Sequence, residues 1–458
     1  MTDKTPRGVV LAYLKETVFR GGEGTFASPN ITTASMHAFD VLKSPPDPPI
    51  NYRTREEYWE IGEGRSLARI TDLGFASGEV SLELGLQTAI FIYYALGACI
   101  TTGSDPYYHT IYEANTLPSM AFLYQNNEDP DSPNGTPAND INKIVWGCVV
   151  SNITIVVEQG AEITMTVDLM TAKTQDNAHT GDQLRLTDDT KPSRFTLKVF
   201  TYEDFSHSDS WVRYADASVT AITTSTLDSL TDATTLGITE EDLTADQLTG
   251  CAVYISAGEG KGQMREINTV TSTTEFTVTR PFTVNPTSAG SYTSTVVVYD
   301  ADFGTAADAT AHFDDLIGTS DWTHIDQIEI NITNTLELRP CVGDPYPAKF
   351  VVGKREYALK FHLYPQNHKT LLDLRNVAYA NYTGPIWARL TFIDSVAGQG
   401  SHALELTHDN LYLSDFPDHI ADWDEIIVGI DIEFRSAPNN DVCVNMVDDA
   451  NKAHYEVS

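Results

Sequence analysis

Alternation of apolar and polar residues is the strongest pattern along the chain. In residues 161–170 the apolar members are Ile163, Met165, Val167 and Leu169, and the polar members are Glu162, Thr164, Thr166 and Asp168. A period of two is typical of a strand with one buried face. The run 145–157 before it also has the composition of a strand, and the residues EQGAE between the two runs favour a tight turn. Together the two runs predict a β-hairpin.

The same period returns in the last third of the chain. In segment 328–336, Ile328, Ile330 and Ile332 alternate with Glu329, Asn331 and Thr333. Further strands are predicted at 355–363, 387–393, 403–413 and 426–434. Helical periodicity is limited to 80–98, which we expect to begin as a strand and continue as a helix, and to 367–376. The predicted fold is mainly β, an antiparallel β-sandwich or barrel with one or two helices.

A change of composition divides the chain. Residues 216–246 are rich in Thr, Asp, Ser and Ala, and 247–299 returns to short strand-like runs. This predicts a small β module inserted at 211–305, between a first part of the core at 1–210 and a second part at 306–458. Long polar loops are expected at 125–142 and 172–193, and loops of this length are usually functional, disordered or part of an interface.

Charge and composition narrow the function. The 458 residues include 29 Lys and Arg against 64 Asp and Glu, for a formal net charge of -35. Nucleic-acid binders concentrate Lys and Arg, so this balance excludes a phosphate-gripping groove as the main function. The start of the chain has no long apolar run, so we expect no secretory signal, and the apolar run 86–100 is too short to cross a bilayer. The five cysteines form no CxxC pair, which predicts buried thiols made in a reducing cytoplasm.

Motifs for catalysis or cofactor binding are weak. The segment 258–262 (GEGKG) contains a lysine between glycines, but it lacks the spacing and the Ser or Thr of a phosphate loop, so we expect a plain turn. The acidic run 129–135 lacks the distal glutamate of a calcium loop. The histidines form no HExxH, and no GxSxG is present. We therefore predict a structural protein, with no catalytic residues, cofactor or metal.

An ordered series of short motifs carries a family resemblance. It contains EVSLEL at 79–84, YALG at 94–97, YHT at 108–110, LPSMAF at 117–122 and WGCVVSNIT at 146–154, followed by the 161–170 strand. The C-terminal third adds 328–336, VGKREY at 352–357 and the two late strand runs. This order resembles the tail tube proteins of tailed bacterial and archaeal viruses. The resemblance covers about 1–210 and 300–458, and the inserted module departs from it.

The resemblance implies a two-sheet subunit with a helix packed on its outside. Such subunits form hexameric rings whose inner sheets join around a channel, and the stacked rings make the tube for genome delivery. The implied partners are further copies of the chain, the tape measure, tail terminator and baseplate or tip proteins, and double-stranded DNA that passes without specific binding. The implied location is the virion tail, after synthesis in the host cytoplasm and without a membrane.

Two groups of residues are the candidate sites of such a subunit. The predicted lumen-facing residues are Glu162, Thr164, Thr166, Asp168, Glu329, Asn331 and Thr333. The predicted ring-stacking residues are Asn126, Asp129, Asp131, Asn134 and Asp140. Because duplex DNA carries one charge per roughly 1.7 Å, an acidic lumen would leave it mobile. The alternative for the lumen group is that these polar faces point outward and the charge only keeps the exterior soluble.

Two other classes of function stay open. A glycan-binding virion-surface or secreted β protein would use exposed aromatic residues of the module, and its candidates are Trp211, Tyr254, Tyr292 and Tyr299. Core packing is the competing explanation for the same four side chains. A polysaccharide-degrading enzyme would need two carboxylates at a defined separation, which a sequence does not reveal.

Overall fold

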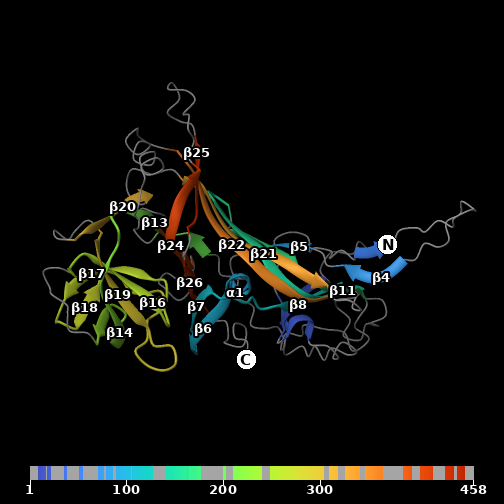
Figure 1. Ribbon diagram of the computed structural model, residues 1–458, viewed down its shortest axis with the longest axis horizontal. Helices are drawn as coiled ribbons and strands as arrows, with labels where there is room; N and C mark the ends of the chain where they lie inside the picture. The colour runs from blue at the N-terminus through green and yellow to red at the C-terminus, as the bar shows by residue number, and fades with distance from the viewer. Residues whose placement is uncertain are drawn as a thin grey trace, which may run out of the picture.

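The computed structural model describes twenty segments of the chain. They are residues 9–16, 18–21, 36–38, 51–54, 71–76, 79–85, 89–104, 106–126, 141–161, 163–176, 200–202, 210–239, 248–303, 309–317, 325–340, 346–364, 385–394, 403–415, 429–437 and 441–448. Within these segments the protein is mainly β, with one α-helix, α1, at Ile90–Leu96. The predicted fold class is therefore confirmed. Two packed sheets form the body of the molecule, and a smaller barrel lies beside them (Figure 1).

Sheet 1 contains the predicted hairpin and three of the later strands. Its order is β5 (Glu79–Gly85), β10 (Thr164–Met170), β9 (Ile141–Glu158), β21 (Ile325–Pro340), β22 (Pro347–Leu363) and β25 (Ile430–Ser436). Every neighbouring pair is antiparallel. The alternation of apolar and polar residues in the sequence matches the alternating burial of these strands, which have one buried face and one face that is not buried.

Sheet 2 packs against the apolar face of sheet 1. Its order is β6 (Gly97–Gly103), β7 (Tyr107–Glu113), β26 (Val442–Asp448), β24 (Ala403–Asp415), β23 (Ile386–Asp394), β13 (Trp211–Ala215) and β20 (Ala311–Ile317). A short strand, β12 (Phe200–Tyr202), also pairs with β23. The far end of β24 pairs with β25, so this strand connects the two sheets.

The main hydrophobic core lies between the two sheets and includes α1. All seven helix residues are buried, so the helix does not pack on the outside as the family resemblance implies. The side chain of Asn334 on β21 donates a hydrogen bond to the carbonyl of Ala95, at 3.0 Å. The helix ends at Gly97, which has a positive φ of 109°. A Cβ at this position would lie only 2.5 Å from the Thr116 carbonyl oxygen, so both the backbone conformation and the available space require glycine. The predicted change from strand to helix within 80–98 is confirmed, and the predicted helix at 367–376 lies outside the described residues.

The remaining N-terminal strands extend from the first half of β9. That half pairs with β8 (Met120–Asn126) and β11 (Lys173–Asp176), and β8 continues to β1 (Val9–Lys15) and β2 (Met36–Ala38). A 3-10 turn, η2, covers Phe19–Gly21, and β3 (Asn51–Thr54) pairs with β4 (Thr71–Ala76) in a separate ribbon. The two halves of β9 have different partners because the strand has a positive φ of 62° at Gly147 and an irregular register at Ser151.

The inserted segment forms a closed antiparallel barrel of six strands. In order around the barrel they are β14 (Ala221–Asp232), β15 (Thr235–Ile238), β18 (Glu275–Val278), β17 (Met264–Val270), β16 (Cys251–Ala257) and β19 (Thr295–Asp302), and β19 pairs again with β14. A second core of apolar residues, including Phe276, Val253 and Val298, fills it. The barrel occupies the yellow-green part of Figure 1. Strand β13, at the start of the segment 211–305, pairs with β23 and β20 of sheet 2.

Among the described residues, no helix is long and apolar enough to cross a membrane.

Candidate functional sites

The outer face of sheet 1 carries most of the predicted lumen-facing residues. Thr164, Thr166 and Asp168 come from β10, and Glu329, Asn331 and Thr333 come from β21. Strand β9 lies between them and places Thr154 opposite both Thr166 and Asn331. Six of the seven predicted residues therefore share one polar face of a single sheet. The seventh, Glu162, lies outside the described residues.

Hydrogen bonds join this face from strand to strand. The Asn152 side chain donates to Asp168 Oδ2 at 3.2 Å and accepts from Thr333 Oγ1 at 2.9 Å. Thr154 Oγ1 donates to Asn331 Oδ1 at 2.8 Å. Asn152 and Thr154 were not among the predicted lumen-facing residues, although they alternate with buried Ile153 and Ile155. The shared bonds fix side-chain positions across β10, β9 and β21.

Charged residues on the same face occur as pairs of opposite sign. Four basic side chains bond carboxylates. Lys360 lies 2.7 Å from Glu329, Lys354 lies 2.5 Å from Glu356, Arg435 lies 2.9 Å from Glu433, and Arg339 lies 2.7 Å from Glu337. Partial burial raises the pKa of Glu329, but hydrogen bonds from Lys360 and Asn331 outweigh it and the pKa is lowered. The face is therefore a hydroxyl- and amide-rich surface with paired charges, and it is less uniformly acidic than β10 and β21 alone predict.

Only one of the predicted ring-stacking residues lies in the described part of the chain. Asn126 ends strand β8. Asp129, Asp131, Asn134 and Asp140 lie outside the described residues, as does most of the long loop 172–193.

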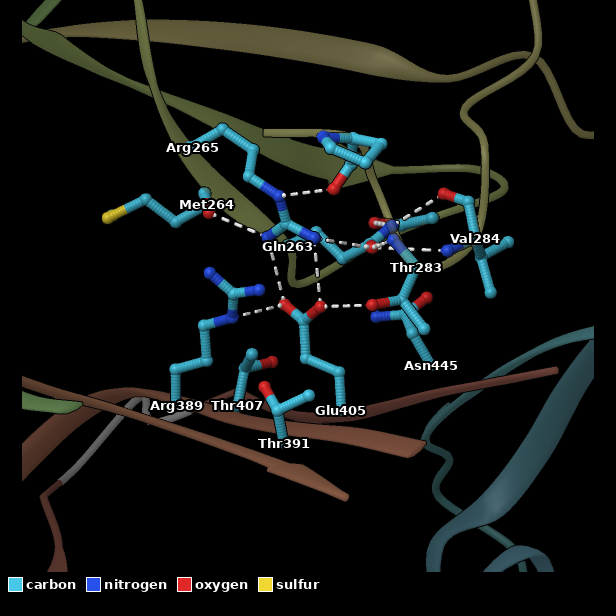
Figure 2. Close-up of polar contacts among 12 residues, drawn as sticks. Gln263, Met264, Arg265, Thr283, Val284, Arg389, Thr391, Glu405, Thr407 and Asn445 are labelled. Atoms are coloured by element: carbon cyan, nitrogen blue, oxygen red, sulfur yellow. Dashed lines mark hydrogen bonds and ion pairs between the residues drawn. The ribbon is translucent and has the colours of Figure 1, made fainter. Parts of the chain in front are cut away.

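A second polar site lies between the barrel and the outer face of sheet 2 (Figure 2). Arg265 of β17 contacts both carboxylate oxygens of Glu405 on β24, with Nη1–Oε1 at 3.1 Å and Nη2–Oε2 at 2.9 Å. Arg389 Nε of β23 lies 3.2 Å from Glu405 Oε1, and Thr283 Oγ1 donates to Oε2 at 2.6 Å. The side chain of Glu405 is fully buried. We call these four residues the buried ionic cluster.

The buried ionic cluster holds a charged carboxylate out of water. Burial by itself raises the pKa of Glu405, but the guanidinium groups of Arg265 and Arg389 reverse this effect and lower the pKa to about 2. Gln263 supports the cluster from behind: its Oε1 accepts from the backbone N–H of Thr283 at 2.7 Å, and its Nε2 donates to the Val284 carbonyl at 2.7 Å. Because the carboxylate is enclosed and already bonded, this cluster fixes the barrel on sheet 2 and offers no place for a substrate.

The glycine-rich segment 258–262 is part of the same interface. Gly258, Gly260 and Gly262 all have positive φ, which shapes the turn between β16 and β17. The backbone N–H of Gly260 donates to Thr110 Oγ1 at 2.9 Å, and Asn445 donates to the Lys261 carbonyl at 2.8 Å. The Lys261 ammonium lies 2.5 Å from the Asp441 carboxylate. The segment is a turn, as predicted, and because it contacts sheet 2 we call it the docking turn.

An aromatic cluster completes the interface and buries two of the candidate glycan-contacting residues, with a third partly buried beside them. Trp211 and Tyr254 are 4% and 5% exposed, and Tyr254 packs edge-on against Trp387 with ring centroids 5.3 Å apart. Tyr299 stacks beside Tyr254 at 6.2 Å. Of the four candidates only Tyr292 has a large exposed fraction, 41%. For Trp211 and Tyr254 the structure therefore confirms core packing, the competing explanation, because both side chains pack where the barrel meets the sandwich.

Among the described residues, no group of three or more His, Cys, Asp or Glu side chains is arranged to hold a metal ion. A scan against models of protein families finds no match to the chain, and a search of curated proteins finds no match either.

Proposed function

We propose that this protein is the repeating subunit of a viral tail tube, with the outer face of sheet 1 lining the channel. The observation that carries the proposal is the difference between the two outer faces of the sandwich. The barrel covers the outer face of sheet 2 through Glu405, Trp387 and Asn445. The outer face of sheet 1 remains polar and accessible, with Thr333 exposed and Lys360 and Glu329 partly so. Only one sheet is thus available to face a water-filled channel.

The chemistry of this face suits the passage of DNA without binding. Free lysine or arginine side chains would hold phosphates and release counterions. Here four basic side chains of this sheet, Lys354, Lys360, Arg435 and Arg339, each already bond a carboxylate. The hydroxyl and amide groups between them are bonded to one another. In this proposal the partners are further copies of the chain and the other tail proteins, the location is the virion tail, and the protein has no catalytic role.

The outward position of the barrel agrees with this arrangement. A folded barrel attached to sheet 2 lies on the side of the sandwich away from the proposed channel face (Figure 1). The channel would therefore stay open although the chain has an insertion. The glycan-binding alternative has less support, because three of its four candidate aromatic residues pack into the barrel interface.

Negative-stain microscopy of the purified full-length protein tests the proposal directly. We expect hollow tubes of stacked rings at high protein concentration. Protein that remains monomeric at every concentration and salt condition would contradict the proposal.

A second experiment tests which face lines the channel. The double variant Thr166→Lys, Thr333→Lys adds two unpaired cations to the outer face of sheet 1. We expect tubes of this variant to retain short duplex DNA and to release it as salt is raised, because phosphate binding by lysine weakens with salt. Thr279→Lys on the exposed surface of the barrel is the matched control. Equal DNA retention by both variants would place the proposed face away from the channel.

A further inference from the structure

A lysine and an aspartate meet at the barrel interface, where the docking turn reaches the start of β26. The Lys261 ammonium lies 2.5 Å from Asp441 Oδ2, and the two side chains are only 20% and 27% exposed. By contrast, the lysines of two ion pairs on sheet 1, Lys360 and Lys354, are 45% and 75% exposed. The contact between Lys261 and Asp441 is therefore shielded from water to an extent that these surface pairs are not.

Neighbouring groups hold both partners in place. Asn445 of β26 donates to the Lys261 carbonyl at 2.8 Å. The backbone N–H of Asp441 donates to Asp409 Oδ1 at 2.6 Å, which ties the residue before β26 to β24. The Tyr112 ring lies beside the ammonium, with its centroid 5.2 Å from Lys261 Nζ. An amine and a carboxyl group that are held in contact by such neighbours have a high effective concentration for reaction with each other.

A third carboxyl group beside the pair is suited to proton transfer. Burial, with the Asp441 carboxylate nearby, raises the pKa of Asp409 to about 7. A group whose pKa lies near the working pH is an efficient general acid and base. Asp409 can therefore hold a proton next to Asp441 at neutral pH.

The Asp441 carboxyl group also has a hydrogen-bond donor on each oxygen. Lys261 bonds Oδ2, and the Cys443 thiol donates to Oδ1 at 3.8 Å. Donors in these places stabilise the negative charge that develops on oxygen when a nucleophile attacks the carboxyl carbon. Burial raises the pKa of the Cys443 thiol well above its usual range, so the thiol stays neutral and does not compete as a nucleophile.

We propose that Lys261 and Asp441 condense to an amide, which joins the barrel covalently to sheet 2. Burial lowers the pKa of Lys261, but Cys443 and Asp441 outweigh it and the pKa is raised, so the pair starts as ammonium and carboxylate. A proton first passes from the ammonium to the Asp441 carboxylate, which leaves a neutral amine and a carboxylic acid. The Nζ lone pair then attacks Asp441 Cγ, while the Asp409 carboxyl donates its proton to the carbonyl oxygen.

The reaction is complete when one C–O bond of Asp441 breaks. Water leaves with two of the three ammonium protons, the third stays on the amide nitrogen, and Asp409 takes its own proton back. No oxidant, reductant or further reactant is consumed. The amide replaces two charges whose shielding from water is costly. The crosslink does not depend on the proposed tail tube function, because both groups belong to one chain.

Mass spectrometry of the purified full-length protein tests the proposal. In a tryptic digest we expect the peptide that contains Lys261 to be joined to the peptide that contains Asp441, with a combined mass lower than their sum by one water molecule. Trypsin should also fail to cleave after Lys261. Lys261→Arg keeps the charge but has no amine to condense, so the joined peptide should be lost. Lys360→Arg changes the lysine of an exposed pair, and this matched control should keep the joined peptide.

The role of Asp409 has a separate test. Asp409→Asn should slow formation of the joined peptide by at least about tenfold, because the general acid is lost. Asp409→Glu should restore it, and circular dichroism checks that each variant is folded. Equal rates in Asp409→Asn and wild type would overturn the role of Asp409. A wild-type protein that trypsin cleaves fully after Lys261, with both peptides at their separate masses, would overturn the crosslink itself, whether or not the protein forms tubes.

Discussion

Glu405 is the residue on which the attachment of the barrel depends most. Glu405→Gln would leave Arg265 and Arg389 buried together without a carboxylate between them. Breaking a buried ion pair on one side typically costs about 3–5 kcal/mol, and we expect the free energy of unfolding to fall by that amount. Urea unfolding measures the loss. Glu337→Gln removes an exposed pair with Arg339 and should cost less than about 1 kcal/mol. Equal losses in the two variants would contradict the role of the cluster.

The Glu405 carboxylate should also make the stability of the protein fall at acid pH. Because the folded-state pKa of Glu405 is lowered from 4.5 to about 2, its contribution is complete above 4.5 and is lost as pH falls toward 2. Glu405→Gln should therefore be less stable than wild type at neutral pH and should approach it in stability as pH falls through this range. Urea unfolding at a series of pH values checks the prediction. A constant difference between the two proteins from pH 6 to pH 2 would refute it.

Asp409 should have the opposite effect on stability, which it lowers as pH rises. Burial, with the Asp441 carboxylate nearby, raises the pKa of Asp409 from 3.8 to about 7. A raised carboxyl pKa gives stability that is complete below 3.8 and is lost as pH rises through 7. Asp409→Asn should remove this slope between pH 4 and pH 7, measured by urea unfolding. Asp228→Asn, on an exposed position of β14, should keep the wild-type slope.

At the scale of elements, alternation revealed strands only where one face is exposed. The strands at 161–170 and 328–336 were predicted because sheet 1 has a solvated face. By contrast, the start of β16 is buried on both faces, and its residues from Cys251 to Ile255 show no alternation. The family resemblance suggested an exterior helix, and the structure buries α1, because its apolar residues cover its whole circumference.

The polar face was largely predictable and the barrel interface was not. Thr164, Thr166 and Asp168 lie on one strand, so local periodicity alone assigns them to one face. Glu405 alternates with buried Leu404 and Leu406 just as a solvent-facing residue would. Its partner Arg265 is 140 positions away in the chain, and only the folded topology brings the two together. Periodicity separates core from non-core faces, but it does not tell water from a second packed element.

The docking turn gives a prediction at the same scale. A Cβ at Gly262 would lie 2.3 Å from Cys443 Cβ and 2.8 Å from Thr407 Oγ1, in addition to the strain of a φ of 91°. Gly290 has a similar φ of 86°, but a Cβ there would meet nothing within 4 Å. Gly262→Ala should therefore destabilise the protein more than Gly290→Ala, which carries only the backbone cost of about 1–2 kcal/mol. Thermal unfolding of both variants measures the difference, and equal melting temperatures would show that the turn does not dock tightly.

At the scale of the whole molecule, the two outer faces of the sandwich differ, because one is accessible and the barrel covers the other. Sheet 1 keeps a polar face whose groups bond one another. Sheet 2 has Trp387, Glu405 and Asn445 on its outer face, and each contacts the barrel. The barrel has a core of its own and is closed by its own strands, yet its attachment is buried and not a flexible linkage. The inserted segment is thus a structural cover for sheet 2 as well as a separate fold.

Deletion of the barrel tests that conclusion. For an appended module, removing residues 216–299 would leave assembly intact. The structure predicts otherwise, because the deletion exposes Trp387 and leaves Glu405 and Arg389 without Arg265. We expect the simple deletion to aggregate, since exposed apolar surface of this kind promotes association. Adding Trp387→Thr to the deletion should recover part of the soluble protein, measured by sedimentation of freshly purified samples. A simple deletion that stays soluble and as stable as the full-length protein would mean that the barrel contributes nothing to the sandwich on which it rests.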